Sequence, residues 1–193
     1  MKLNVVLFWV IFLIVPTRSV SQTNFIYKSL KEAAVVHPDS VRNLDLSKQK
    51  LTVFPEQILQ YSNLESLNLS KNKLTKLPNS ITYLKNLEVL NLSKNKFTIF
   101  PIPLCNTIAL KKLFLGRNGI SLLPDCIGQL KNLEHLDIWY NSISSLPSSI
   151  SKLKNLKTLD FRGVNLSLKA QEQISALLPN TKIEFDLGCD CAH

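Results

Sequence analysis

The chain has 193 residues and a formal net charge of +9, with 23 Lys and Arg against 14 Asp and Glu. This length suits one domain, and the repeat described below fills so much of it that no room remains for a separate catalytic domain. The basic balance persists without residues 1–21, because that segment contains only two of the basic residues, Lys2 and Arg18.

The first 21 residues have the pattern of an export signal. Lys2 supplies a positive start, residues 3–16 are almost wholly apolar, and residues 19–21 place small side chains where a signal peptidase reads them. We expect cleavage before Gln22. An uncleaved anchor is the alternative, but the apolar run is shorter than the roughly 20 residues that span a bilayer. The sequence therefore predicts a secreted or cell-envelope protein that is not transmembrane after cleavage.

Residues 22–40 are predicted to form a helical N-terminal cap. Apolar side chains at Ile26, Leu30 and Ala33 have the spacing of one face of a helix over residues 24–36. Ser29 stands three residues before Glu32, which is the spacing of a capping box. Such a helix would cover the open apolar end of a repeat array.

Residues 41–178 repeat with a period of 23 residues, which gives about six coils. The unit reads L-x-x-L-x-L-x-x-N-x-L-x-x-L-P-x-x-I-x-x-L-x-N. Its central leucine recurs at Leu44, Leu67, Leu90, Leu113, Leu136 and Leu159. Side chains alternate along a short strand, so these leucines point inward together. One coil cannot bury its own leucines, and we expect neighbouring coils to stack about 4.8 Å apart as a parallel sheet.

Two other positions of the unit shape each coil. An inward asparagine after the strand can donate to and accept from backbone groups at the turn. These asparagines are Asn72, Asn95, Asn118 and Asn141. A proline then stops the strand because it lacks an N–H donor, and a short helical turn is expected after it. The prolines are Pro55, Pro78, Pro101, Pro124 and Pro147. The fold class predicted is an α/β solenoid, curved, with its sheet on the concave side and helical turns on the convex side.

The template is stretched at the end of the chain. Val164 stands where the next asparagine is expected. We predict a true helix over residues 168–178 and a last strand over residues 182–185, so that residues 179–193 form a C-terminal cap strand and tail.

The unit resembles the 23-residue LPxxI type of leucine-rich repeat, as in ras-binding scaffold proteins and many bacterial surface proteins. The segments "YKSLKEAAVVHPDSVRNLDLSKQKLTVFP" and "ISALLPNTKIEF" are similar to the entry and exit caps of secreted bacterial leucine-rich repeat proteins. This resemblance implies the solenoid fold, a bacterial source and a role in binding. It does not identify the partner, because this scaffold serves many partners.

Four cysteines remain to be explained. Cys105 and Cys126 lie on the convex side of adjacent coils, 21 rather than 23 residues apart, and a bridge needs Cα atoms within about 7 Å. The sequence favours two unpaired cysteines, with a disulfide as the alternative that export would permit. The tail, residues 189–193, lacks the ligand set and spacing of a zinc site. No metal or other cofactor is expected, and pairing of the tail with another molecule stays open.

The outward strand positions change character along the array. In the first three coils they are small and mostly neutral, as at Ser66, Asn68 and Ser70. In the next three coils they become aromatic and charged, which is typical of a binding hot spot. We call the candidate partner-binding residues the concave patch: Lys112, Phe114, Arg117, His135, Asp137, Trp139, Tyr140, Asp160 and Arg162. The alternative is that Phe114 and Trp139 stack on each other and only stiffen the sheet.

Lysines and one arginine repeat along one edge of the predicted sheet. We call these residues the basic edge: Lys48, Lys50, Lys71, Lys73, Lys94, Lys96 and Arg117. An anionic polymer or membrane surface could bind there, but the sequence favours solvated lysines at a tolerant template position. Nucleic acid is not an expected partner, because the protein is exported and the edge has no interleaved aromatics for base stacking.

Two function classes follow from these features. The first is a secreted or surface-exposed module that binds a protein through its concave face. The second is a carbohydrate or cell-envelope binder, in which Trp139 and Tyr140 stack on sugar rings while Asp137 and Asp160 accept hydroxyl protons. An enzyme is disfavoured, because no outward Ser or Cys stands beside His135 and Asp137 to complete a nucleophilic set.

Overall fold

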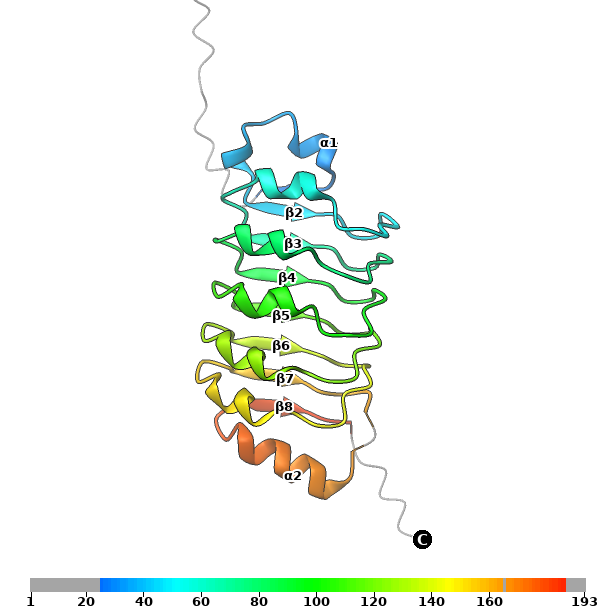
Figure 1. Ribbon diagram of the computed structural model, residues 1–193, viewed down its shortest axis with the longest axis vertical. Helices are drawn as coiled ribbons and strands as arrows, with labels where there is room; N and C mark the ends of the chain where they lie inside the picture. The colour runs from blue at the N-terminus through cyan, green and yellow to red at the C-terminus, as the bar shows by residue number, and fades with distance from the viewer. Residues whose placement is uncertain (1–24, 165, 187–193) are drawn as a thin grey trace, which may run out of the picture.

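The computed structural model describes residues 25–164 and 166–186. These residues form one parallel sheet of eight strands in chain order, and Figure 1 shows neighbouring strands side by side along the molecule. The strands are β1 (Ile26–Tyr27), β2 (Asn43–Asp45), β3 (Ser66–Asn68), β4 (Val89–Asn91), β5 (Lys112–Phe114), β6 (His135–Asp137), β7 (Thr158–Asp160) and β8 (Lys182–Glu184). The predicted export signal, Gln22 and the cysteines of the tail lie outside the described residues.

The coils stack in the register that the 23-residue period predicts. Leu67 pairs with Leu90, and Leu90 with Leu113, and the same pairing continues to Leu159. The central leucines of β2 to β7 are no more than 1% exposed. A continuous row of buried leucines therefore runs through the array, and the predicted solenoid is confirmed.

Short 3₁₀-helical turns lie opposite the sheet, as Figure 1 shows. They are η2 (Pro38–Ser40), η3 (Glu56–Gln60), η4 (Asn79–Tyr83), η5 (Ile102–Asn106), η6 (Asp125–Gln129) and η7 (Ser148–Lys152). From η3 onward each turn begins directly after the template proline. The inward residue of each of these turns, such as Ile58 or Ile81, is fully buried.

The asparagine ladder forms as predicted. The Asn95 side chain accepts a hydrogen bond from the Leu74 N–H at 3.0 Å and donates to the carbonyl oxygens of Leu69 and Leu92 at 3.0 and 2.9 Å. The same three contacts recur around Asn72, Asn118 and Asn141. Each amide thereby joins its own coil to the preceding one and satisfies three backbone groups that would otherwise be unpaired.

The N-terminal segment differs from the predicted helix. Ile26 and Tyr27 form β1, which pairs with β2, and the helix α1 spans only Leu30–Ala33. Ser29 caps α1 as predicted, because its hydroxyl accepts from the Glu32 N–H at 3.0 Å. Tyr27 is buried in the core, so pairing and packing in the sheet outweigh the helical spacing of the preceding apolar residues.

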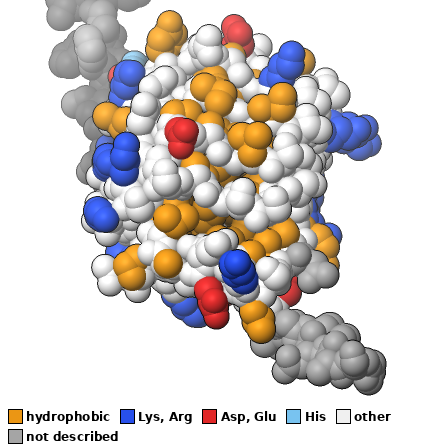
Figure 2. All heavy atoms as spheres, turned by 60° about the horizontal axis from the view of Figure 1, so that its bottom comes forward, with side chains coloured by type: hydrophobic (Ala, Val, Ile, Leu, Met, Phe, Trp, Pro, Cys, Tyr) orange, Lys and Arg blue, Asp and Glu red, His pale blue; other side chains and the backbone are white. Residues whose placement is uncertain are grey.

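The C-terminal elements agree with the prediction within one residue at their ends. The helix α2 spans Leu168–Leu177 and begins at the Ser167 cap, and β8 then pairs with β7. Figure 2 looks toward this end of the solenoid and shows scattered hydrophobic side chains, with most Lys and Arg near the margins. Within the described ranges, no helix is long and apolar enough to cross a bilayer.

The favoured prediction for Cys105 and Cys126 is wrong, because the two residues form a disulfide. Their Cα atoms lie 5.6 Å apart. Cys105 lies near the end of η5 and Cys126 near the start of η6. The two-residue offset that argued against pairing still leaves the two Cα atoms within the reach of a disulfide.

Candidate functional site

The concave patch lies along β5, β6 and β7 and the turns that follow them. Parallel register sets Lys112 beside His135 and Phe114 beside Asp137. It also sets Asp137 beside Asp160. The structure therefore brings the predicted residues together on one surface, as neighbours on adjacent strands.

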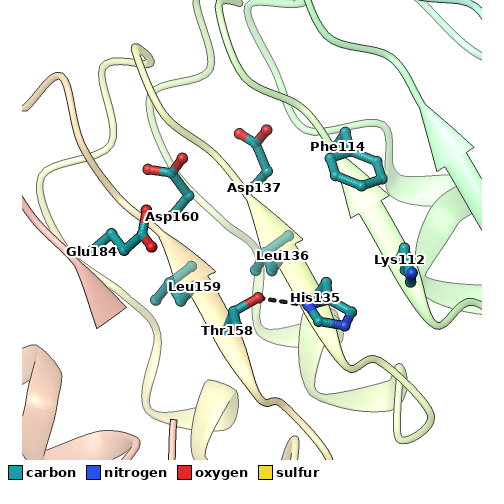
Figure 3. A pocket seen from close by; sticks show the side chains of 9 residues that line it. All are labelled: Lys112, Phe114, His135, Leu136, Asp137, Thr158, Leu159, Asp160 and Glu184. Atoms are coloured by element: carbon teal, nitrogen blue, oxygen red, sulfur yellow. Dashed lines mark hydrogen bonds between the residues drawn. The ribbon is translucent and has the colours of Figure 1, made fainter. Parts of the chain in front are cut away.

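A hollow of about 300 Å³ opens over these strands, as Figure 3 shows. One row of its lining contains His135 and Thr158, whose Nδ1 and Oγ1 atoms share a hydrogen bond at 2.7 Å. The other row is acidic, because β8 adds Glu184 beside Asp160 and Asp137. Phe114 lies at the end of this acidic row. The hollow combines an aromatic surface, carboxylates and a cationic side chain, Lys112.

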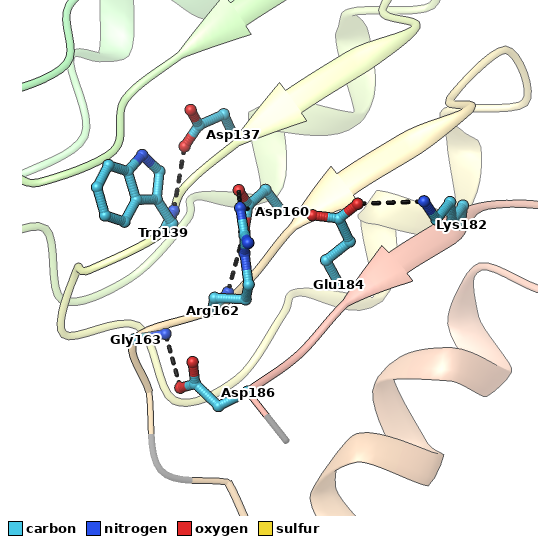
Figure 4. A network of polar contacts seen from close by, with 8 residues as sticks. All are labelled: Asp137, Trp139, Asp160, Arg162, Gly163, Lys182, Glu184 and Asp186. Atoms are coloured by element: carbon cyan, nitrogen blue, oxygen red, sulfur yellow. Dashed lines mark hydrogen bonds and ion pairs between the residues drawn. The ribbon is translucent and has the colours of Figure 1, made fainter. Parts of the chain in front are cut away.

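Asp137 and Asp160 differ in their electrostatic surroundings. Burial raises the pKa of Asp137 to about 6, the negative charge of Asp160 adds to this rise, and the hydrogen bond from the Trp139 N–H opposes it. Asp160 instead binds Arg162 in a bidentate pair with distances of 2.9 and 2.6 Å. This hydrogen bond raises the pKa of Arg162. Figure 4 shows the network, in which Arg162 also lies 3.5 Å from Glu184.

The carboxylates of Asp137 and Asp160 also have a structural role. Each accepts a hydrogen bond from the N–H two residues later, at 3.2 and 3.3 Å. Asn68 and Asn91 make the same contact in earlier coils. In β5 the equivalent residue is Phe114, whose side chain cannot accept this hydrogen bond, so at this position the coil departs from the template.

Trp139 rests on the backbone of the preceding coil. A Cβ atom added to Gly116 would lie 2.0 Å from the indole Nε1, so the indole needs the glycine beneath it. The Arg117 guanidinium lies over the indole at 4.7 Å from its centroid, and the Tyr140 ring meets it edge to face at 5.2 Å. The predicted alternative of a Phe114–Trp139 stack is not found among the ring contacts of the described residues.

A second hollow, of about 440 Å³, opens past the strand ends. Trp139, Tyr140 and Arg162 line it, and Tyr140 is 57% exposed. Asp137 and Asp160 border both hollows. The concave patch is therefore one continuous surface.

Sequence reasoning missed Glu184 and Asp186 on this surface and the role of Gly116. Gly116 seats the indole, and Glu184 and Asp186 extend the acidic side from the last strand. The alignment of Ile183 with Leu159 places Glu184 next to Asp160 and could have found it. In the part of the chain that the structure describes, no group of three or more His, Cys, Asp or Glu is placed to hold a metal.

Comparisons with known proteins agree with this architecture. The family model described as leucine rich repeat matches residues 39–97, and the model for two copies of leucine rich repeats matches residues 131–179. No curated protein matches the sequence significantly.

Two solved structures are similar to this chain. A leucine-rich repeat protein of Leptospira interrogans is 32% identical with a TM-score of 0.65, over 80% of this chain and 45% of that one. Internalin C2 of Listeria monocytogenes is 23% identical with a TM-score of 0.65, over 82% of this chain and 66% of that one, and shows the fold alone. The chain thus spans less than half of the Leptospira protein. With repeat models matched in both halves and the coils stacked in register, the chain belongs to the leucine-rich repeat proteins.

Proposed function

We propose that this protein is an exported, non-enzymatic module that binds a protein partner through the concave patch. Leucine-rich repeats commonly mediate protein–protein interaction, and their curved stacks offer extended concave surfaces. The observation that carries the proposal is the change at β5. From there on, aromatic and charged side chains replace small ones around two adjoining hollows.

The arrangement of the aromatic side chains supports this proposal. Trp139 is held by Gly116, Arg117 and Tyr140 before any partner arrives. A side chain that is already ordered loses little conformational entropy on binding, and aromatic residues of this kind dominate interface energetics. Phe114 supplies an apolar surface beside the acidic row.

The disulfide supports export. Bridges such as Cys105–Cys126 form and persist in oxidising environments and are rare in reducing ones. This agrees with the predicted signal segment.

Site-specific photocrosslinking tests the proposed surface. A benzophenone side chain replaces Tyr140, which is 57% exposed in the concave patch, and in a matched control it replaces Tyr83, which is 69% exposed on η4. In the native cell envelope we expect a protein adduct from position 140 that disappears when Phe114→Ala is added. Equal adducts from both positions, or an adduct that survives Phe114→Ala, would refute the proposal.

A glycan is the second candidate partner, and the second hollow favours it. Trp139 and Tyr140 lie there beside Asp137 and Asp160, a combination that suits a sugar ring. The Arg117 guanidinium, however, lies over the indole that a sugar would stack on. A glycan array decides between the two, because sugar binding that Trp139→Ala removes would replace the protein partner with a carbohydrate.

A further inference from the structure

The basic edge is a regular column on the side of the sheet where the strands end. The N–H groups of Lys48, Lys71 and Lys94 donate to the carbonyls of the next coil at 2.8–3.1 Å. The N–H groups of Lys73 and Lys96 donate to the preceding coil at 2.7 and 2.9 Å. Backbone pairing therefore continues past the strands and fixes the lysines about one strand spacing apart, roughly 4.8 Å.

This column lacks the charge pairing that the same chain uses elsewhere. One position before the strands reads Arg42, Glu65, Glu88, Lys111, Glu134 and Lys157 along the coils. Neighbours there form ion pairs, as between Lys111 and Glu88 at 2.7 Å and between Lys157 and Glu134 at 2.5 Å. Within residues 25–164 and 166–186, no carboxylate forms an ion pair with the basic edge. The basic edge is uniformly positive, whereas this other row of the same repeat mixes both charges.

The backbone of the column is also unfavourable for lysine. Lys48, Lys71 and Lys94 have φ angles of 60°, 59° and 58°, in the left-handed region that favours glycine or asparagine. Gly163 occupies the equivalent position in the last coil, with a φ of 82°. Arg117 and Tyr140 have φ angles of 54° and 49° at the same position of the next coils, so the turn imposes this conformation whatever the side chain.

We propose that the basic edge binds a linear polyanion that runs along the solenoid, with successive anionic groups against successive coils. The column is narrow and ends at Arg117, because Tyr140 and Gly163 follow at its position. Further along the array the neighbouring groups are acidic, including Asp160, Glu184 and Asp186. A linear polymer can contact the lysine column alone, whereas a flat anionic membrane along the whole edge would also meet these carboxylates. This surface meets the concave patch at Arg117, which belongs to both, and its lysines do not line the acidic hollows.

The test measures binding of the full chain to inorganic polyphosphate. The variant Lys48→Gln/Lys71→Gln/Lys94→Gln removes three charges and leaves the left-handed backbone positions occupied by side chains of similar length. The control Lys85→Gln/Lys131→Gln/Lys154→Gln removes three charges from exposed lysines, also in coil-to-coil register, outside the basic edge. Circular dichroism of both variants checks that they are folded.

We expect the edge variant to bind polyphosphate at least about tenfold more weakly and to have a salt slope shallower by about 2–3, whereas the control changes affinity less than about twofold. Inorganic monophosphate at equal phosphate concentration should not compete. No binding by the unmodified chain at low salt, or equal losses in the two variants, would overturn the proposal. Binding to phosphatidylglycerol vesicles without binding to polyphosphate would also overturn it in favour of a membrane surface.

Discussion

The amide ladder gives a direct test of what stabilises the stacked coils. Asn95→Ala removes a side chain that is part of the interior of the turn and leaves its apolar neighbours in place. The Asn95 amide makes three hydrogen bonds to backbone groups, one to Leu74 and one each to Leu69 and Leu92. The substitution should therefore lower the free energy of unfolding without changing the outer surface.

The magnitude follows from the number of bonds lost. A hydrogen bond contributes about 1 kcal/mol net, so three lost bonds predict a loss of about 3 kcal/mol. Asn91 provides the matched control, because it lies in the same coil and its side chain accepts one bond, from the Ser93 N–H at 3.0 Å. Asn91→Ala should cost about 1 kcal/mol.

Urea denaturation followed by far-UV circular dichroism measures both variants. The reasoning requires Asn95→Ala to be less stable than Asn91→Ala by about 2 kcal/mol. If the two variants unfold at the same urea concentration, the half-buried Asn95 amide does not satisfy the turn, and water or a shifted backbone must do so instead.

Three further predictions concern backbone strain, the disulfide and pH. Lys94 has a φ of 58°, so Lys94→Gly should relieve strain and raise the free energy of unfolding by about 0.5–1 kcal/mol. Lys85 lies outside the left-handed region, and Lys85→Gly should lower the free energy of unfolding. Urea denaturation of both variants tests this difference. Cys105→Ala/Cys126→Ala should lose about 3 kcal/mol, from the entropy that the bridge removes from the unfolded chain, and reducing agent should then have no further effect on its unfolding. Burial raises the pKa of Asp137 in the folded state to about 6, whereas an exposed carboxyl has a pKa of about 4. Between about pH 4 and pH 6 the folded state therefore holds a proton that the unfolded state has released, and the free energy of unfolding falls as pH rises through this range. Asp137→Asn should therefore be more stable near pH 7 by about 1 kcal/mol, a value discounted for solvent screening, and the gain should vanish near pH 4 in thermal unfolding curves.

The period of the sequence predicted the strands because each coil depends on its neighbours in the same way. Leu67 and Leu90 are buried by the coils on either side, so their spacing carries the register. The strand β1 was missed for the complementary reason. Two residues contain no repeat, and Ile26 and Tyr27 become a strand only because the open edge of β2 offers partners.

The site shows the same division between spacing and local geometry. Register alone placed Phe114 beside Asp137. The contact of Trp139 with Gly116 depends instead on a side-chain conformation, and so does the turn of Arg162 back onto Asp160. A pattern of residue types states which side chains are neighbours. It does not state which charged side chains form ion pairs with each other and which remain available to a partner.

The outward rows of this solenoid differ in how far folding constrains them. The row that contains Glu88 and Lys111 pairs its charges between coils, and its three ion pairs in the described coils each add a small stabilising contact. The basic edge does the opposite, because its side chains stack like charges on a left-handed backbone and form no ion pair within the described residues. Since buried leucines such as Leu113 hold the coils together, the outward rows can carry such costs without loss of the fold. We therefore propose that recognition in this protein belongs at the positions where the side chains present are not the ones that folding alone would favour: the basic edge and the aromatic part of the concave patch.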